Sequence, residues 1–129
     1  MEKIFIEREV HKMLNVPENI NQVIEEFVNG VKEILGDNLK KIILYGSYAR
    51  GDYNENSDID IMILTNLEGK ELKMNRDKIY DYCYDIEEKN NFHIDVSPLV
   101  KNIDRFNYWL EALPFYMNVQ KEGVVLSES

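Results

Sequence analysis

The chain has 129 residues, 44% of them hydrophobic, and we expect a single domain over residues 1–129. Its formal net charge is −9 and its 15 basic residues do not cluster, which argues against direct binding of nucleic acid and fits a basic protein partner or a small cationic acceptor. No apolar run reaches the roughly 18 residues of a membrane span, so we expect no membrane contact. No signal peptide is evident and Cys83 is the single cysteine, so we expect a cytoplasmic protein.

The first third of the sequence predicts one long helix and one strand. Residues 1–15 form an N-terminal extension whose pattern leaves strand and helix open. Pro17 is expected to begin a helix, because apolar residues follow it at spacings of three and four until Gly36, a typical C-terminal stop. Residues 39–45 are expected to form a strand, and its unbroken apolar run at residues 42–44 indicates burial on both faces.

The remaining elements complete a mixed α/β pattern. A second strand is expected from about residue 57 to 64, a long helix over residues 68–89 and a third strand over residues 92–97. A helix over 102–112, a short one from Pro114 to 120 and an edge strand at 124–126 follow. The expected fold is therefore α/β (α+β), a small mixed sheet flanked by helices.

The second strand is apolar apart from two carboxylates. Asp58 and Asp60 are two residues apart, so on a strand they project from one face. At roughly 4–6 Å their repulsion is on the order of 3–4 kcal/mol at an effective dielectric constant near 20. A divalent cation between them removes this cost, and oxygen ligands suit Mg²⁺. The alternative is that both lie on the solvated face of an edge strand.

Gly46 and Ser47 stand at the end of the first strand. Glycine lets the backbone approach a ligand, and a short helix starting near Ser47 would offer free N–H groups and a hydroxyl to a phosphate. Arg50, one turn further on, adds a positive charge. By itself Gly46-Ser47 fits an ordinary turn, but next to Asp58 and Asp60 it indicates a phosphoryl or nucleotidyl transferase.

Gly46-Ser47, ten further residues and Asp58-Ile59-Asp60 resemble the signature of the polymerase-beta-like nucleotidyltransferases. The run from Gly46 to Gly51 is similar to the minimal nucleotidyltransferase branch, which includes antitoxins paired with HEPN-family RNase toxins. The resemblance implies that Asp58 and Asp60 bridge two Mg²⁺ ions and that Gly46, Ser47 and Arg50 face the triphosphate of ATP.

The resemblance also implies a third carboxylate on a neighbouring strand. Strand alternation places His93, Asp95 and Ser97 on one face, so Asp95 is the candidate for completing the metal site near the attacking hydroxyl. The alternative is that Asp95 is a solvent-facing strand residue.

The resemblance implies AMP transfer from ATP to a hydroxyl. Only 34 residues follow Asp95, too few for a second, acceptor-binding domain, so we expect another protein or a second copy to present the acceptor. The family suggests a tyrosine of a HEPN-family RNase toxin, with this chain as the antitoxin. Two alternatives are a nucleotidyltransferase for an aminoglycoside-like alcohol, acting as a homodimer, and a non-catalytic antitoxin that covers the toxin.

Overall fold

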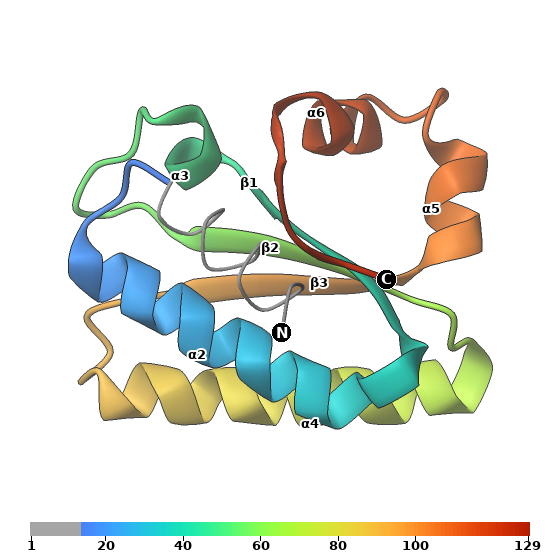
Figure 1. The fold of residues 1–129 in the computed structure, drawn as a ribbon, viewed down its shortest axis with the longest axis horizontal. Coiled ribbons are helices and arrows are strands. Elements are labelled where there is room, and N and C mark those ends of the chain that lie inside the picture. Colours follow the sequence, from blue (N-terminus) through green and yellow to red (C-terminus); the bar gives the residue numbers. More distant parts are fainter. Residues whose placement is uncertain (1–13) are drawn as a thin grey trace.

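A computed structural model describes residues 14–129 of the chain; most of the N-terminal extension at residues 1–15 therefore lies outside the described residues. Within the described part, four strands and five α-helices alternate with one short 3₁₀ turn (Figure 1). In chain order they are α2 (Glu18–Leu35), η1 (Gly36–Asn38), β1 (Leu39–Tyr45), α3 (Ser47–Arg50), β2 (Ile59–Thr65), α4 (Gly69–Lys89), β3 (Val96–Asn102), α5 (Ile103–Trp109), α6 (Pro114–Glu122) and β4 (Val124–Glu128). None of the helices within residues 14–129 combines the length and apolar character that crossing a membrane requires.

The strands form one mixed sheet in the order β3-β2-β1-β4. β1 pairs antiparallel with β2 and with β4, whereas β2 and β3 run parallel. The predicted mixed sheet and the edge position of the last strand are therefore confirmed. The register places Tyr45 opposite Asp60 and Ile59 opposite Val96, so the end of β1 and the beginnings of β2 and β3 meet at one end of the sheet.

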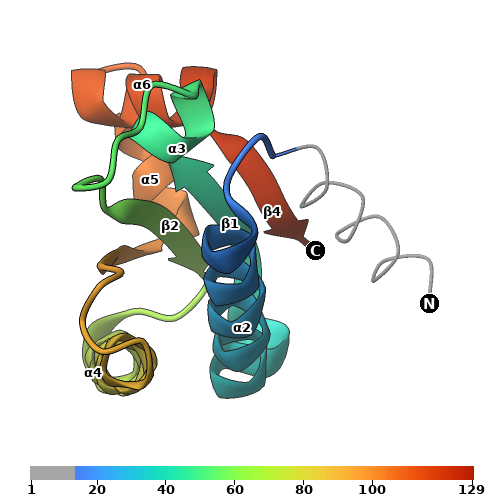
Figure 2. The same ribbon diagram turned by 90° about the vertical axis from the view of Figure 1, so that its left-hand side faces the viewer.

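Helices cover both faces of the sheet. α2 and α4 lie side by side on one face, and α5 and α6 lie on the other (Figures 1 and 2). Each pair packs on its own hydrophobic cluster: Phe27 and Ile79 belong to the cluster under α2 and α4, whereas Phe106 and Val119 belong to the cluster under α5 and α6. The sheet is thus the middle layer of three.

Burial on both faces explains why β1 is apolar without alternation, as predicted. Ile42 and Leu44 point into the cluster under α2 and α4, while Ile43 and Tyr45 point into the opposite cluster. All four side chains are at most 8% exposed. A half-exposed sheet would instead show a polar residue at every second position.

The long helix after Pro17 is confirmed, and Pro17 is its N-cap residue, one position before the first helical residue. Gly36 caps its C-terminus with φ 53° and donates its N–H to the carbonyl of Lys32. The predicted helix over residues 68–89 is confirmed as α4, and the helix from Pro114 extends to Glu122.

The prediction of the third strand was wrong in its bounds. Residues 92–95 precede the strand, and β3 extends from Val96 to Asn102. Asn91 and Phe92 take φ values of 56° and 58°, so the chain is still turning where the strand was expected to begin. β3 contains Pro98, which the sheet accommodates because β3 is an edge strand and needs ladder hydrogen bonds on one side only. Asn102 then caps α5, its side chain accepting a hydrogen bond from the Arg105 N–H at 3.0 Å.

Candidate functional site

The turn between β1 and α3 requires a glycine. Gly46 adopts φ 77° and ψ −157°, a region that is essentially restricted to glycine. A Cβ at this position would also collide with the Asp60 carboxylate, whose Cγ would lie at 3.2 Å. Gly46 therefore lets the backbone at the end of β1 lie directly against the Asp60 side chain.

A short helix, α3, does begin at Ser47, which is the condition under which Gly46 and Ser47 could hold a phosphate. The N–H groups of Ala49 and Arg50 donate to the Gly46 carbonyl at 3.1 and 3.0 Å, and the Gly51 N–H donates to Ser47 O at 2.9 Å. These bonds use the later N–H groups of the turn, while the first N–H groups of a helix, here those of Ser47 and Tyr48, have no acceptor within it. Ser47 is half-buried at this helix start, next to the end of β1.

Asp60 lies on the face of the sheet that α5 and α6 cover. Met62 and Leu64, the next residues of β2 on that face, pack in the cluster under these helices. Burial, followed by the charge of Asp58, raises the pKa of Asp60, and Arg50 opposes the shift. Asp58 is exposed, immediately ahead of β2. The two carboxylates thus repel one another at a partly desolvated position, which is the electrostatic setting that a bound cation relieves.

Asp95 lies at the same end of the sheet. Its carbonyl accepts a hydrogen bond from the Ile59 N–H at 2.8 Å, and the parallel register places it beside Asp58. Asp95 is exposed and, like Asp58, precedes its strand. Between residues 14 and 129, no three His, Cys, Asp or Glu side chains are close enough together to form a metal centre. A three-carboxylate magnesium site therefore remains a prediction, supported by the shared location of the backbone positions and by the coupling of Asp58 and Asp60.

Arg50 has partners that the sequence did not predict. Its guanidinium forms ion pairs with Asp52 at 3.2 Å and with Glu122 of α6 at 3.0 Å. Arg50 therefore links α3 and the loop that follows it to α6. The Arg50 charge nonetheless acts on Asp60, where it opposes the rise in pKa that burial and Asp58 cause.

Tyr45 and Ser97 complete the surroundings of Asp60. They are the residues opposite Asp60 on the two neighbouring strands, Tyr45 on β1 and Ser97 on β3. Burial and the Asp60 charge raise the pKa of Tyr45 to about 12, so its hydroxyl stays protonated. Sequence reasoning placed Ser97 beside Asp95 but missed both residues as neighbours of Asp60, because only the strand register brings them there.

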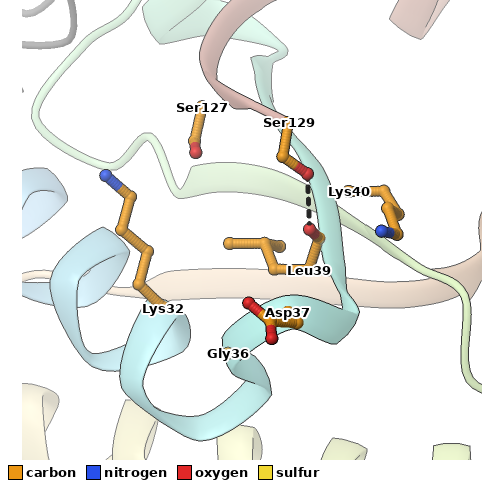
Figure 3. A pocket seen from close by; sticks show the side chains of 7 residues that line it. All are labelled: Lys32, Gly36, Asp37, Leu39, Lys40, Ser127 and Ser129. Carbon is orange, nitrogen blue, oxygen red and sulfur yellow. Dashed lines mark hydrogen bonds between the residues drawn. The ribbon is translucent and has the colours of Figure 1, made fainter. Parts of the chain in front are cut away.

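A cavity of about 620 Å³ lies at the opposite end of β1, beside η1 (Figure 3). Lys32 and Lys40 stand on either side of Leu39, and the Ser129 hydroxyl donates to the Leu39 carbonyl at 2.9 Å. Since the carboxylates lie at the Tyr45 end of β1, this cavity is separate from the candidate site.

Comparisons with known proteins agree with the geometry. Residues 24–126 match the nucleotidyltransferase domain family. The protein named "Putative protein adenylyltransferase MJ0604" of Methanocaldococcus jannaschii is 38% identical over 110 residues, which cover 84% of this chain and 98% of the relative.

Two solved structures share the fold. A "putative nucleotidyltransferase" from Sulfolobus solfataricus is 22% identical, with a TM-score of 0.52 over 92% of this chain and 84% of that one. A mutant of the toxin-antitoxin MntA-HpeT gives a TM-score of 0.50 at 19% identity, over 81% of this chain and 73% of the other. At these identities the likeness concerns the fold alone. The family match and the long M. jannaschii alignment together show that this chain belongs to the nucleotidyltransferase domain family and is a nucleotidyltransferase.

Proposed function

We propose that the protein transfers AMP from ATP to a hydroxyl group of a partner protein. The observation that carries this proposal is the 38% identity across nearly the whole length of a relative named as a protein adenylyltransferase. We further propose that the acceptor is a tyrosine of a HEPN-family RNase toxin, so that this chain acts as its antitoxin. A solved structure with the same fold is described as the toxin-antitoxin MntA-HpeT, so this acceptor is the first to test.

The triphosphate of ATP would bind at the turn between β1 and α3. The N–H groups at the start of α3 and the Ser47 hydroxyl are suitable donors for phosphate oxygens. Gly46 carries no side chain that would block the approach, and Arg50 supplies positive charge nearby. These three residues would hold the nucleotide with its phosphates towards Asp58 and Asp60.

Asp58, Asp60 and Asp95 would hold two Mg²⁺ ions, which when bound stabilise the attacking and leaving oxygens of an in-line displacement. Asp95, being exposed at the end of the sheet, can face the acceptor and take its hydroxyl proton. The acceptor oxygen then forms a bond to the α-phosphorus, the bond to the bridging oxygen breaks, and pyrophosphate leaves.

The open position of two carboxylates supports a macromolecular acceptor. Asp58 and Asp95 are both exposed, so a side chain on the surface of another protein can reach them. A small alcohol would need walls on several sides to be oriented, since small-molecule sites enclose most of their ligand.

The test is AMP transfer in vitro. The chain is incubated with ATP, Mg²⁺ and a HEPN-family RNase toxin from the same organism, and the intact mass of the toxin is measured together with its RNase activity. We expect a mass increase of whole AMP units and loss of RNase activity, both prevented by replacing the acceptor tyrosine with phenylalanine.

Two variants of this chain serve as a matched pair. Asp60→Asn should lower the rate of transfer by about 10²–10⁴, roughly 3–5 kcal/mol of transition-state stabilisation. Asp77→Asn removes an exposed carboxylate of α4 and should leave the rate unchanged. The proposal is wrong if no AMP is added to the toxin, or if inhibition of the RNase persists in the Asp60→Asn variant.

A further inference from the structure

Basic residues that are far apart in the sequence meet in one groove. A groove of about 870 Å³ lies between the first half of α4, the end of β3 and the α5–α6 segment. Arg76 of α4, Lys101 of β3 and Arg105 of α5 line it, and Glu68 is its acidic lining residue. The expectation that basic residues do not cluster was therefore wrong, because three different elements contribute one cation each.

Within the part of the chain that the structure describes, these three cations have no acidic partner. No ion pair within residues 14–129 involves Arg76, Lys101 or Arg105. In a chain whose net charge is −9, a site with three cations and one carboxylate is a local reversal of sign. Such a site attracts an anionic group while the surrounding surface repels long polyanions.

The groove also has an exposed apolar part. Trp109 is 46% exposed and Leu113 39% exposed, and both line the groove together with Tyr116. The segment continues as an exposed hydrophobic surface at Phe115 and Met117. Tryptophan, tyrosine and arginine are the residues that contribute most to binding energy at protein interfaces.

The groove is separate from the carboxylate site. Asp95 directly precedes β3, and Lys101 follows Val96, the first residue of β3, by five residues, which corresponds to about 17 Å of strand. Leu99 lies between them in the chain and packs against the cluster that contains Phe106. A ligand in the groove would thus be held without touching the reacting atoms.

We propose that this groove binds an acidic segment of the partner protein, with carboxylates on Arg76, Lys101 and Arg105 and an apolar side chain against Trp109. The proposal rests on the proposed function in one respect, namely that the acceptor is a protein. A protein segment fits better than nucleic acid, because it can present a few carboxylates next to apolar groups. A nucleic acid draws affinity from many phosphate contacts, and the acidic surroundings disfavour these.

Trp109 makes the groove directly measurable, because it is the single tryptophan of the chain. The probe is a synthetic amphipathic peptide without tryptophan, with glutamates along one side and leucine and phenylalanine along the other. Its counterpart carries lysine in place of every glutamate. Trp109 emission is followed during titration at low and at high salt, without ATP, so the result does not depend on any AMP transfer.

We expect the glutamate peptide to change the Trp109 emission, the lysine peptide to leave it unchanged, and salt to weaken the response. Arg105→Glu and Lys101→Glu should each weaken binding about tenfold. Lys78→Glu makes the same charge change on α4 outside the groove and should have no effect.

The proposal is overturned if the glutamate peptide does not bind or if both peptides bind equally. It is also overturned if Lys78→Glu weakens peptide binding as much as Arg105→Glu does, or if a single-stranded oligonucleotide binds more tightly than the glutamate peptide at the same salt concentration. Because AMP transfer is assayed separately, a groove that binds the peptide in a protein that modifies no toxin would refute the proposed function alone.

Discussion

Replacing Gly46 by alanine tests how the site is built. The substitution places a Cβ in a backbone region that only glycine adopts readily, at a cost of about 1–3 kcal/mol. The same Cβ collides with the Asp60 carboxylate, so Asp60 must leave its position, which costs about 0.5–1.5 kcal/mol more if the side chain is forced off its rotamer.

Gly36→Ala is the matched control. Gly36 also has a positive φ, 53°, but it borders the open cavity of Figure 3, where an added Cβ meets nothing within 4 Å. Both substitutions should therefore lower the melting temperature, by about 3–5 °C per kcal/mol for a domain of this size. Only Gly46→Ala moves a carboxylate of the site.

The assay combines thermal unfolding with AMP transfer, measured well below both melting temperatures. We expect Gly46→Ala to lose about 100-fold or more in transfer rate, because misplacing a reacting group by about 1 Å can cost this factor. Gly36→Ala should keep nearly full activity. If the two variants were equally active, or equally inactive while folded, the contact between Gly46 and Asp60 would not be what organises the site.

Three further predictions concern single side chains. The pKa of Asp60 is raised in the folded protein, so above this pKa the charged carboxylate destabilises the fold, and the destabilisation is lost as the pH falls through the pKa. In the absence of divalent cations, Asp60→Asn should therefore raise the melting temperature at pH 7, and the increase in melting temperature should shrink as the pH is lowered. Arg50→Ala removes exposed ion pairs with Asp52 and Glu122 and should leave the melting temperature unchanged while raising the KM for ATP in transfer assays. Burial and nearby carboxylates raise the pKa of the Cys83 thiol to about 12. Mass spectrometry should therefore show that iodoacetamide labels Cys83 at pH 8 only after the protein is denatured. Rapid labelling of the native protein would contradict the buried position.

The sequence by itself determined the local elements of this protein. Apolar spacing predicted α2 and α4, the unbroken run of β1 predicted burial on both faces, and Gly46 predicted the turn into α3. These features depend on neighbours in the chain, whose periodicity and backbone preferences can be read directly.

The tertiary structure decided which residues from distant parts of the chain lie next to one another. Strand register brought Tyr45 and Ser97 to Asp60, and packing of α6 gave Arg50 the distant partner Glu122. The same packing assembled a cationic groove from α4, β3 and α5. Pairings of this kind arise from contacts between residues far apart in the chain, which no local pattern encodes, and for that reason the predicted scatter of basic charge was wrong.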